Sequence, residues 1–159
     1  MRKSCQELVE RIRGEVSDLD RVVKRAWMTW NRSKQLSSEQ EVYIDSVALN
    51  LHSIYSGLER IFELIARHVG EKIPSGELWH RDLLKQMSQE QKDIRPAVIS
   101  TDSFFCLDEM RRFRHLVRNV YTFNLVPEKV EPIVADLVTS WSKVQAEILA
   151  FADFLEQSG

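Results

Sequence analysis

The sequence of 159 residues contains only two cysteines, five glycines and four prolines. Cys5 and Cys106 lack the CxxC spacing of a zinc site, and two such thiols are typically small buried hydrophobic side chains in a reducing compartment. No apolar stretch approaches the roughly 20 residues that a membrane-spanning helix needs. The N-terminus is charged from its second residue and lacks the apolar segment of a signal peptide. These absences predict a cytoplasmic protein without a metal, another cofactor or a membrane contact.

An excess of charge of one sign is also missing. The 22 Lys and Arg side chains face 24 Asp and Glu side chains, which gives a net charge of −2. Any contact with nucleic acid therefore has to come from a local basic patch. Hydrophobic residues make up 43% of the chain, a composition typical of folded proteins. A chain of this length buries enough surface for one core, so we expect residues 1–159 to form a single domain.

The sequence does contain strong helical periodicity, because apolar side chains recur at three- and four-residue steps. Such spacing is typical of amphipathic helices. It predicts one helix over about residues 3–32 and a second from the serines at 37–38 to Gly70. A shorter third helix includes Met87, a fourth runs from about Asp102 to Tyr121, and a last long helix follows the NLVPEK segment. No segment has a convincing strand pattern. The sequence therefore predicts an all-α fold, an antiparallel helical bundle of about five helices.

The fourth predicted helix carries most of the candidate chemistry. At about 100° per residue, four basic side chains share one exposed stripe opposite the apolar face: Arg111, Arg114, His115 and Arg118. Such a stripe suits anion binding, because arginine side chains match the oxygens of a phosphate in pairs. The alternative is an ordinary solvated face neutralised by neighbouring acids such as Glu109, and composition alone favours it.

The segment FRHLVRNVY within this helix resembles the HEPN superfamily and, within it, the HepT-like branch. The family motif is an arginine, a polar residue, three further residues, a histidine, any residue and a tyrosine. Arg114 matches the arginine, His115 the polar position and Tyr121 the tyrosine. Asn119 stands where the family has its catalytic histidine. The place of the motif, in the penultimate long helix of an all-α chain, also fits the family.

The resemblance implies a toxin-type endoribonuclease that needs no metal ion. In such an enzyme the arginine holds the scissile phosphate and the histidine moves a proton. By this resemblance Arg114, Asn119 and His115 occupy the catalytic region. Arg111 and Arg118 extend it as candidates for binding RNA phosphates.

The resemblance also implies partners. HEPN proteins generally form homodimers, and HepT-type proteins act with a minimal nucleotidyltransferase antitoxin. That antitoxin attaches AMP to the motif tyrosine, which makes Tyr121 a candidate AMPylation site. The alternative for Tyr121 is a packing role at the edge of the buried face.

Asn119 departs from the family pattern, and its amide cannot exchange a proton near neutral pH. General acid–base catalysis contributes roughly 10²- to 10⁴-fold, so we expect weak or absent cleavage unless His115 replaces the missing histidine. Residues five apart on a helix lie about 140° from each other. Arg114 and residue 119 therefore reach one phosphate only if a second subunit contributes or the helix ends near Asn119.

Three functions remain open from the sequence: a HepT-like ribonuclease, a catalytically degenerate protein of the same fold that binds RNA, a nucleotide or a partner protein, and a plain helical interaction protein. Pairing of Asp108 and Glu109 with the arginines of the fourth helix would favour the last. Elsewhere, His80 and Asp82 lie two residues apart and do not face each other on a helix. We expect His80 to have a capping and packing role.

Overall fold

Six helices make up the part of the chain that the computed structural model describes, residues 2–35, 38–70, 72–119 and 127–159. The side chains of Arg2 and of residues 116–119 lie outside this description. In chain order the helices are α1 (Arg2–Gln35), α2 (Gln40–His68), α3 (Trp79–Met87), α4 (Thr101–Asn119), α5 (Pro127–Ala135) and α6 (Leu137–Ser158). The described residues contain no strand. The all-α bundle predicted from the sequence is confirmed.

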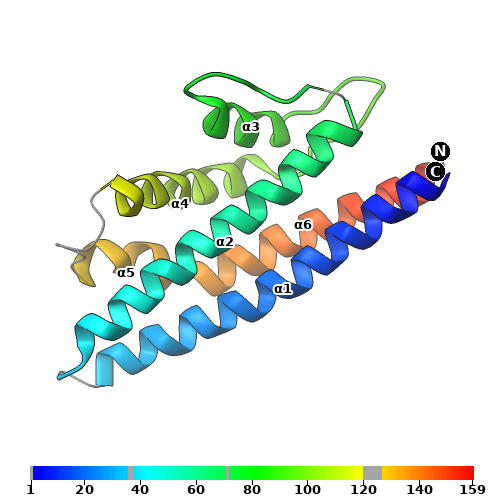
Figure 1. Ribbon diagram of the computed structural model, residues 1–159. Coiled ribbons are helices and arrows are strands. Elements are labelled where there is room, and N and C mark those ends of the chain that lie inside the picture. Colours follow the sequence, from blue (N-terminus) through cyan, green and yellow to red (C-terminus); the bar gives the residue numbers. More distant parts are fainter. Residues whose placement is uncertain (1, 36–37, 71, 120–126) are drawn as a thin grey trace.

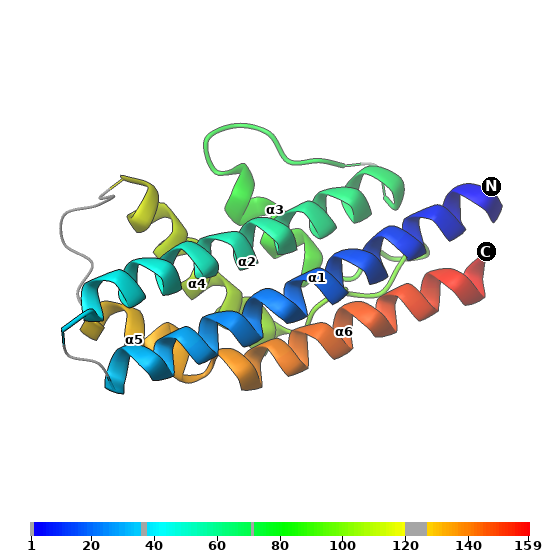
Figure 2. The same ribbon diagram turned by 60° about the horizontal axis from the view of Figure 1, so that its bottom comes forward.

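The long helices α1, α2 and α6 lie side by side, with α1 between the other two (Figure 2). The short connection after α1 makes α1 and α2 antiparallel, and both ends of the chain lie at one end of the bundle (Figure 1). The apolar stripe of α1 is buried along its length: Leu8, Val9, Ile12, Val16, Leu19, Val23, Ala26 and Trp30. A Cβ atom at Gly57 would overlap the side chain of Leu19, so this glycine lets α1 and α2 approach closely.

The shorter helices α3 and α4 pack against α2 and against each other (Figure 1). Glu147 of α6 accepts hydrogen bonds from Ser100 at the start of α4, at 3.0 Å from its N–H and 2.9 Å from its hydroxyl. A carboxylate is favourable there because the helix dipole is positive at its N-terminus. Between α3 and α4, buried Arg95 donates to the carbonyl oxygens of Gln86, Gln89 and Pro96. These bonds attach the start of α4 to α6 and the segment that precedes α4 to the end of α3.

The last predicted helix is divided into α5 and α6 at Asp136. Asp136 has φ −102° and ψ 4°, which departs from helical geometry. Pro132 lies inside α5, where it lacks the N–H that would continue the helical hydrogen-bond pattern. The apolar periodicity runs across this break, because both segments turn their apolar side chains to the same core. Periodicity alone therefore suggested one continuous helix.

Two smaller expectations have different outcomes. Both cysteines carry free thiols, but Cys106 is exposed and Cys5 only partly buried, so the prediction of two buried thiols is wrong. None of the described helices combines the length and apolar composition needed to cross a lipid bilayer.

Candidate functional site

The basic side of α4 contacts α2 and α3. The side chains of Arg114 and Arg111 are only 16% and 20% exposed, whereas His115 is exposed. The prediction that this stripe is exposed is therefore wrong for Arg111 and Arg114. The sequence allowed for pairing with Asp108, which contacts Arg111, but it gave no sign that a carboxylate on another helix, Glu59 of α2, would pair with Arg114.

The remaining predicted site residues lie at the edge of the described part of the chain. Arg118 and Asn119 belong to α4, but their side chains are outside the description. Tyr121 lies wholly outside the described residues. The described part of α4 runs as far as Asn119.

Buried Glu59 of α2 joins α3 and α4 through its two carboxylate oxygens. Its Oε1 accepts a hydrogen bond of 2.9 Å from Nη1 of Arg114, and its Oε2 lies 2.6 Å from Nδ1 of His80. The side chain of Glu59 is only 7% exposed. A buried carboxylate is strongly unfavourable unless it is paired and hydrogen-bonded. Arg114 and His80 satisfy this requirement, and the Glu59 bridge holds both side chains beside each other.

Four side chains that are positive or can become positive line one surface depression beside this bridge: His80, Arg111, Arg114 and His115. His80 comes from α3 and the other three from α4. Glu59 accepts a hydrogen bond from Nη1 of Arg114, and Nε and Nη2 are further donors of the same planar guanidinium group. This depression can therefore accept an anion of phosphate type without breaking the Glu59–Arg114 pair.

A sequence model of the family described as HepT-like protein matches residues 46–155, a span that includes α3 and α4 and most of α2 and α6. The chain belongs to the HepT-like family of the HEPN superfamily. No curated protein and no solved structure shows significant similarity to it. The resemblance seen in the α4 segment is thus confirmed over most of the chain.

Buried Tyr55 of α2 packs against Arg114, one of the residues that line the depression. The guanidinium carbon of Arg114 lies 5.7 Å from the centre of the Tyr55 ring, within range of a cation–π interaction. Burial raises the pKa of Tyr55, and the neighbouring charge of Glu59 raises it further. Tyr55 therefore stays protonated and acts as a fixed wall against which Arg114 packs.

Asp108 pairs with two arginines of its own helix. Its carboxylate lies 2.8 Å from Nη2 of Arg111 and 2.7 Å from Nη2 of Arg112. Burial alone would raise the pKa of Asp108, but the hydrogen bonds and charges of both arginines outweigh burial and lower it. Pairing of acids with the arginines of α4 was the feature expected of a plain helical interaction protein. The two ion pairs of Asp108 show part of that pairing. It leaves Arg114 unaffected, and Arg111 still lines the depression.

Replacing Asp108 by asparagine is expected to make the free energy of unfolding depend less on pH in the acid range. Because the folded-state pKa lies below the ordinary value of about 3.9, the ion pairs of Asp108 stabilise the protein fully above this value. That contribution is lost as the pH falls through the folded-state pKa. Urea unfolding of both proteins should show a difference that is largest above about pH 5 and disappears in strong acid. A difference that persists unchanged at low pH contradicts this prediction.

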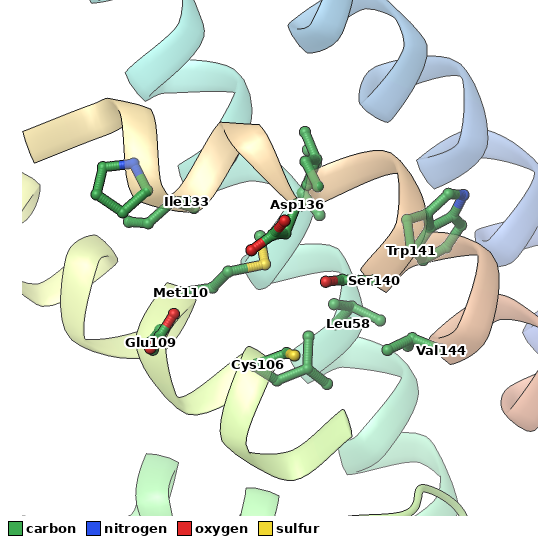
Figure 3. Close-up of a pocket in the computed structure, with 13 residues that line it drawn as sticks. Leu58, Cys106, Glu109, Met110, Ile133, Asp136, Ser140, Trp141 and Val144 are labelled. Carbon is green, nitrogen blue, oxygen red and sulfur yellow. The ribbon is translucent and has the colours of Figure 1, made fainter. Parts of the chain in front are cut away.

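A second pocket lies on the side of α4 that faces α5 and α6 (Figure 3). Its walls are mainly apolar, with Met110, Ile133 and Trp141 among them. Its ionisable side chains include two acids, Glu109 and Asp136. Glu109 therefore lies away from the basic depression, contrary to its suggested role in neutralising the arginines. A phosphate group would be repelled by these two carboxylates.

The sequence reasoning missed Glu59 and assigned His80 only a capping and packing role. Glu59 did leave a signal, since it stands one helical turn from both Tyr55 and Phe62, inside the apolar stripe of α2. A carboxylate at such a position needs a buried partner. In the described part of the chain, no group of three His, Cys, Asp or Glu side chains is arranged to hold a metal ion.

Proposed function

We propose that this HepT-like protein is a toxin-type endoribonuclease that cleaves RNA without a metal ion. The observation that carries the proposal is the gathering of His80, Arg111, Arg114 and His115 around one depression of a slightly acidic protein. An RNA phosphate is the ligand that fits this chemistry, because it offers several anionic oxygens to guanidinium and imidazole donors. The matched family supports the same interpretation.

In this proposal Arg114 binds a non-bridging oxygen of the scissile phosphate. Nε and Nη2 point at the same acceptor region because guanidinium donors form a rigid planar fork. Glu59 holds the other edge of the fork at Nη1, so Arg114 loses little conformational freedom when the phosphate binds. As negative charge grows on the phosphate, this preorganised cation stabilises the transition state. Arg111 and His115 bind the phosphate or its neighbour in the strand, and Arg118 extends this contact.

The partners belong to the same proposal. We expect a cytoplasmic homodimer in which each chain is one HEPN domain, and a minimal nucleotidyltransferase antitoxin that inhibits it. Tyr121 is the proposed acceptor of AMP. AMP on Tyr121 would add a bulky anion only two residues in sequence from Asn119, and its negative charge would oppose the binding of RNA phosphates.

Replacing Arg114 by alanine is expected to reduce RNA cleavage roughly 10²- to 10³-fold, the usual effect of removing a transition-state donor. The assay uses end-labelled RNA of mixed sequence in EDTA, beside DNA of the same sequence, which lacks the attacking 2′-hydroxyl. Arg112→Ala is the matched control. Arg112 is the neighbouring arginine on the same helix and pairs with Asp108, but it does not line the depression. Equal activity of the Arg114→Ala and Arg112→Ala proteins would contradict the proposed site.

The second candidate is a catalytically degenerate protein that binds RNA or a nucleotide at the same depression. Asn119 favours it, because the family's proton-transfer residue is missing at that position. Two carboxylates, those of Glu59 and Asp108, also offset part of the arginine charge. Binding of RNA that depends on Arg114, without any cleavage in EDTA, identifies this second function.

A further inference from the structure

RNA cleavage at this depression needs a group that removes the proton of the attacking 2′-hydroxyl. Asn119 cannot do so, because its amide is neutral and not basic. Two histidines line the depression, His80 from α3 and His115 from α4.

His80 is held on two sides. Its Nδ1 lies 2.6 Å from Oε2 of Glu59, and the ring of Trp79 stacks on it with centroids 3.6 Å apart. Its side chain is 28% exposed, so one edge of the ring reaches solvent. His115 lies on the exposed side of α4. The contacts with Glu59 and Trp79 therefore preorganise the imidazole of His80, and preorganisation is what a proton-transfer group requires.

The contact with Glu59 also determines which nitrogen of His80 carries a proton. Glu59 already accepts a charge-assisted hydrogen bond from Arg114, and a carboxylate has no proton to donate. The proton between Glu59 and His80 therefore belongs to Nδ1. In the neutral ring this leaves Nε2 with a lone pair, which is the arrangement of a general base oriented by a carboxylate.

We propose that His80 is the general base of RNA cleavage in this protein, in place of the histidine that is absent at position 119. The inference rests on the proposed ribonuclease function. Nε2 of His80 takes the proton of the 2′-hydroxyl while the 2′-oxygen forms a bond to phosphorus. The bond from phosphorus to the 5′-oxygen breaks, and that oxygen leaves with the electron pair and takes a proton from water. The products are a 2′,3′-cyclic phosphate and a 5′-hydroxyl, and His80 returns its proton to solvent.

Glu59 connects the two halves of this reaction. One of its oxygens orients Arg114, which binds the phosphate, and the other orients His80, which takes the proton. The carboxylate also stabilises the imidazolium that forms when His80 is protonated. Because both groups are bound to one carboxylate, the base and the phosphate ligand keep a fixed separation. An unrelated surface histidine would have no such link to Arg114.

His80→Asn is the variant that separates proton transfer from structure. The asparagine side chain places an N–H near the position of Nδ1, so it can still donate to Glu59, but it has no basic nitrogen. We expect its maximal rate of cleavage in EDTA to fall at least about a hundredfold. Its RNA affinity and its midpoint of urea unfolding should stay close to those of the natural protein. His80→Gly, which leaves space for a free ring, should regain cleavage when imidazole is added.

The outcomes distinguish the role of His80 from the ribonuclease function. Loss of rate at unchanged RNA affinity, with recovery by imidazole, supports the proposal. Full activity of His80→Asn together with an inactive Arg114→Ala overturns the role of His80 and leaves cleavage at this site standing. A loss of rate matched by equal losses of affinity or stability makes His80 a structural residue. Absence of cleavage by the natural protein overturns both proposals.

Discussion

Replacing Arg114 by methionine is expected to lower the free energy of unfolding by about 3 kcal/mol, near the lower end of the range for breaking a buried ion pair. The side chains of Arg114 and Glu59 are 16% and 7% exposed, so the pair is largely shielded from solvent. Without Arg114, the carboxylate of Glu59 remains buried with His80 as its other described partner. Because His80 still contacts Glu59, we expect the lower value. Urea unfolding measures the loss directly.

The matched comparison is a double variant, Glu59→Leu with Arg114→Met. It removes both charges, so no uncompensated carboxylate stays buried, and we expect it to recover most of the stability that the single variant loses. Arg112→Ala provides a second comparison. The side chain of Arg112 is 67% exposed, and loss of its ion pair should cost less than about 1 kcal/mol. A single Arg114 variant as stable as Arg112→Ala would mean that the Glu59 bridge contributes nothing to the fold.

This stability effect bears on the function as well. Arg114 would then serve both the fold and the phosphate site, so a loss of cleavage in Arg114→Ala has to be measured where the variant is fully folded. The double variant tests this point. If it is stable but does not cleave RNA, the missing activity comes from the lost polar groups of the site, the Arg114 cation and the Glu59 carboxylate that holds His80, and not from unfolding.

Most of the fold could be predicted from the sequence, because each helix buries a continuous apolar stripe. The stripe of α2, from Ile44 to Ile65, is almost wholly buried and was visible as a three- and four-residue repeat. The division at Asp136 was missed because the stripe continues through it. Periodicity reports which side chains are buried, and it does not report a local change of backbone angles.

The site could be predicted only in part. Arg114 was found because it stands in a local motif on one helix. Its partner Glu59 lies 55 residues away, and Glu59 lies 21 residues from His80. Contacts at such separations depend on how α2, α3 and α4 pack, which no local pattern encodes. The same packing turned the expected exposed stripe into two largely buried guanidinium groups, because each faces a carboxylate.

Restoring the family histidine by Asn119→His is expected to increase RNA cleavage, and the size of the increase depends on His80. If His80 already acts as the base, the gain in the natural background is small. In the His80→Asn background, the same substitution should raise the rate roughly a hundredfold or more, because it supplies the missing proton-transfer group.

The natural protein, the two single variants and the double variant form a double-mutant cycle. Their cleavage rates, measured on one RNA in EDTA, should show that the effects of the two substitutions are not additive. Equal gains in both backgrounds would mean that His80 takes no part in proton transfer. A large gain in the natural background, from a protein that otherwise binds RNA without cutting it, would mean that one substitution separates a binding protein from a ribonuclease.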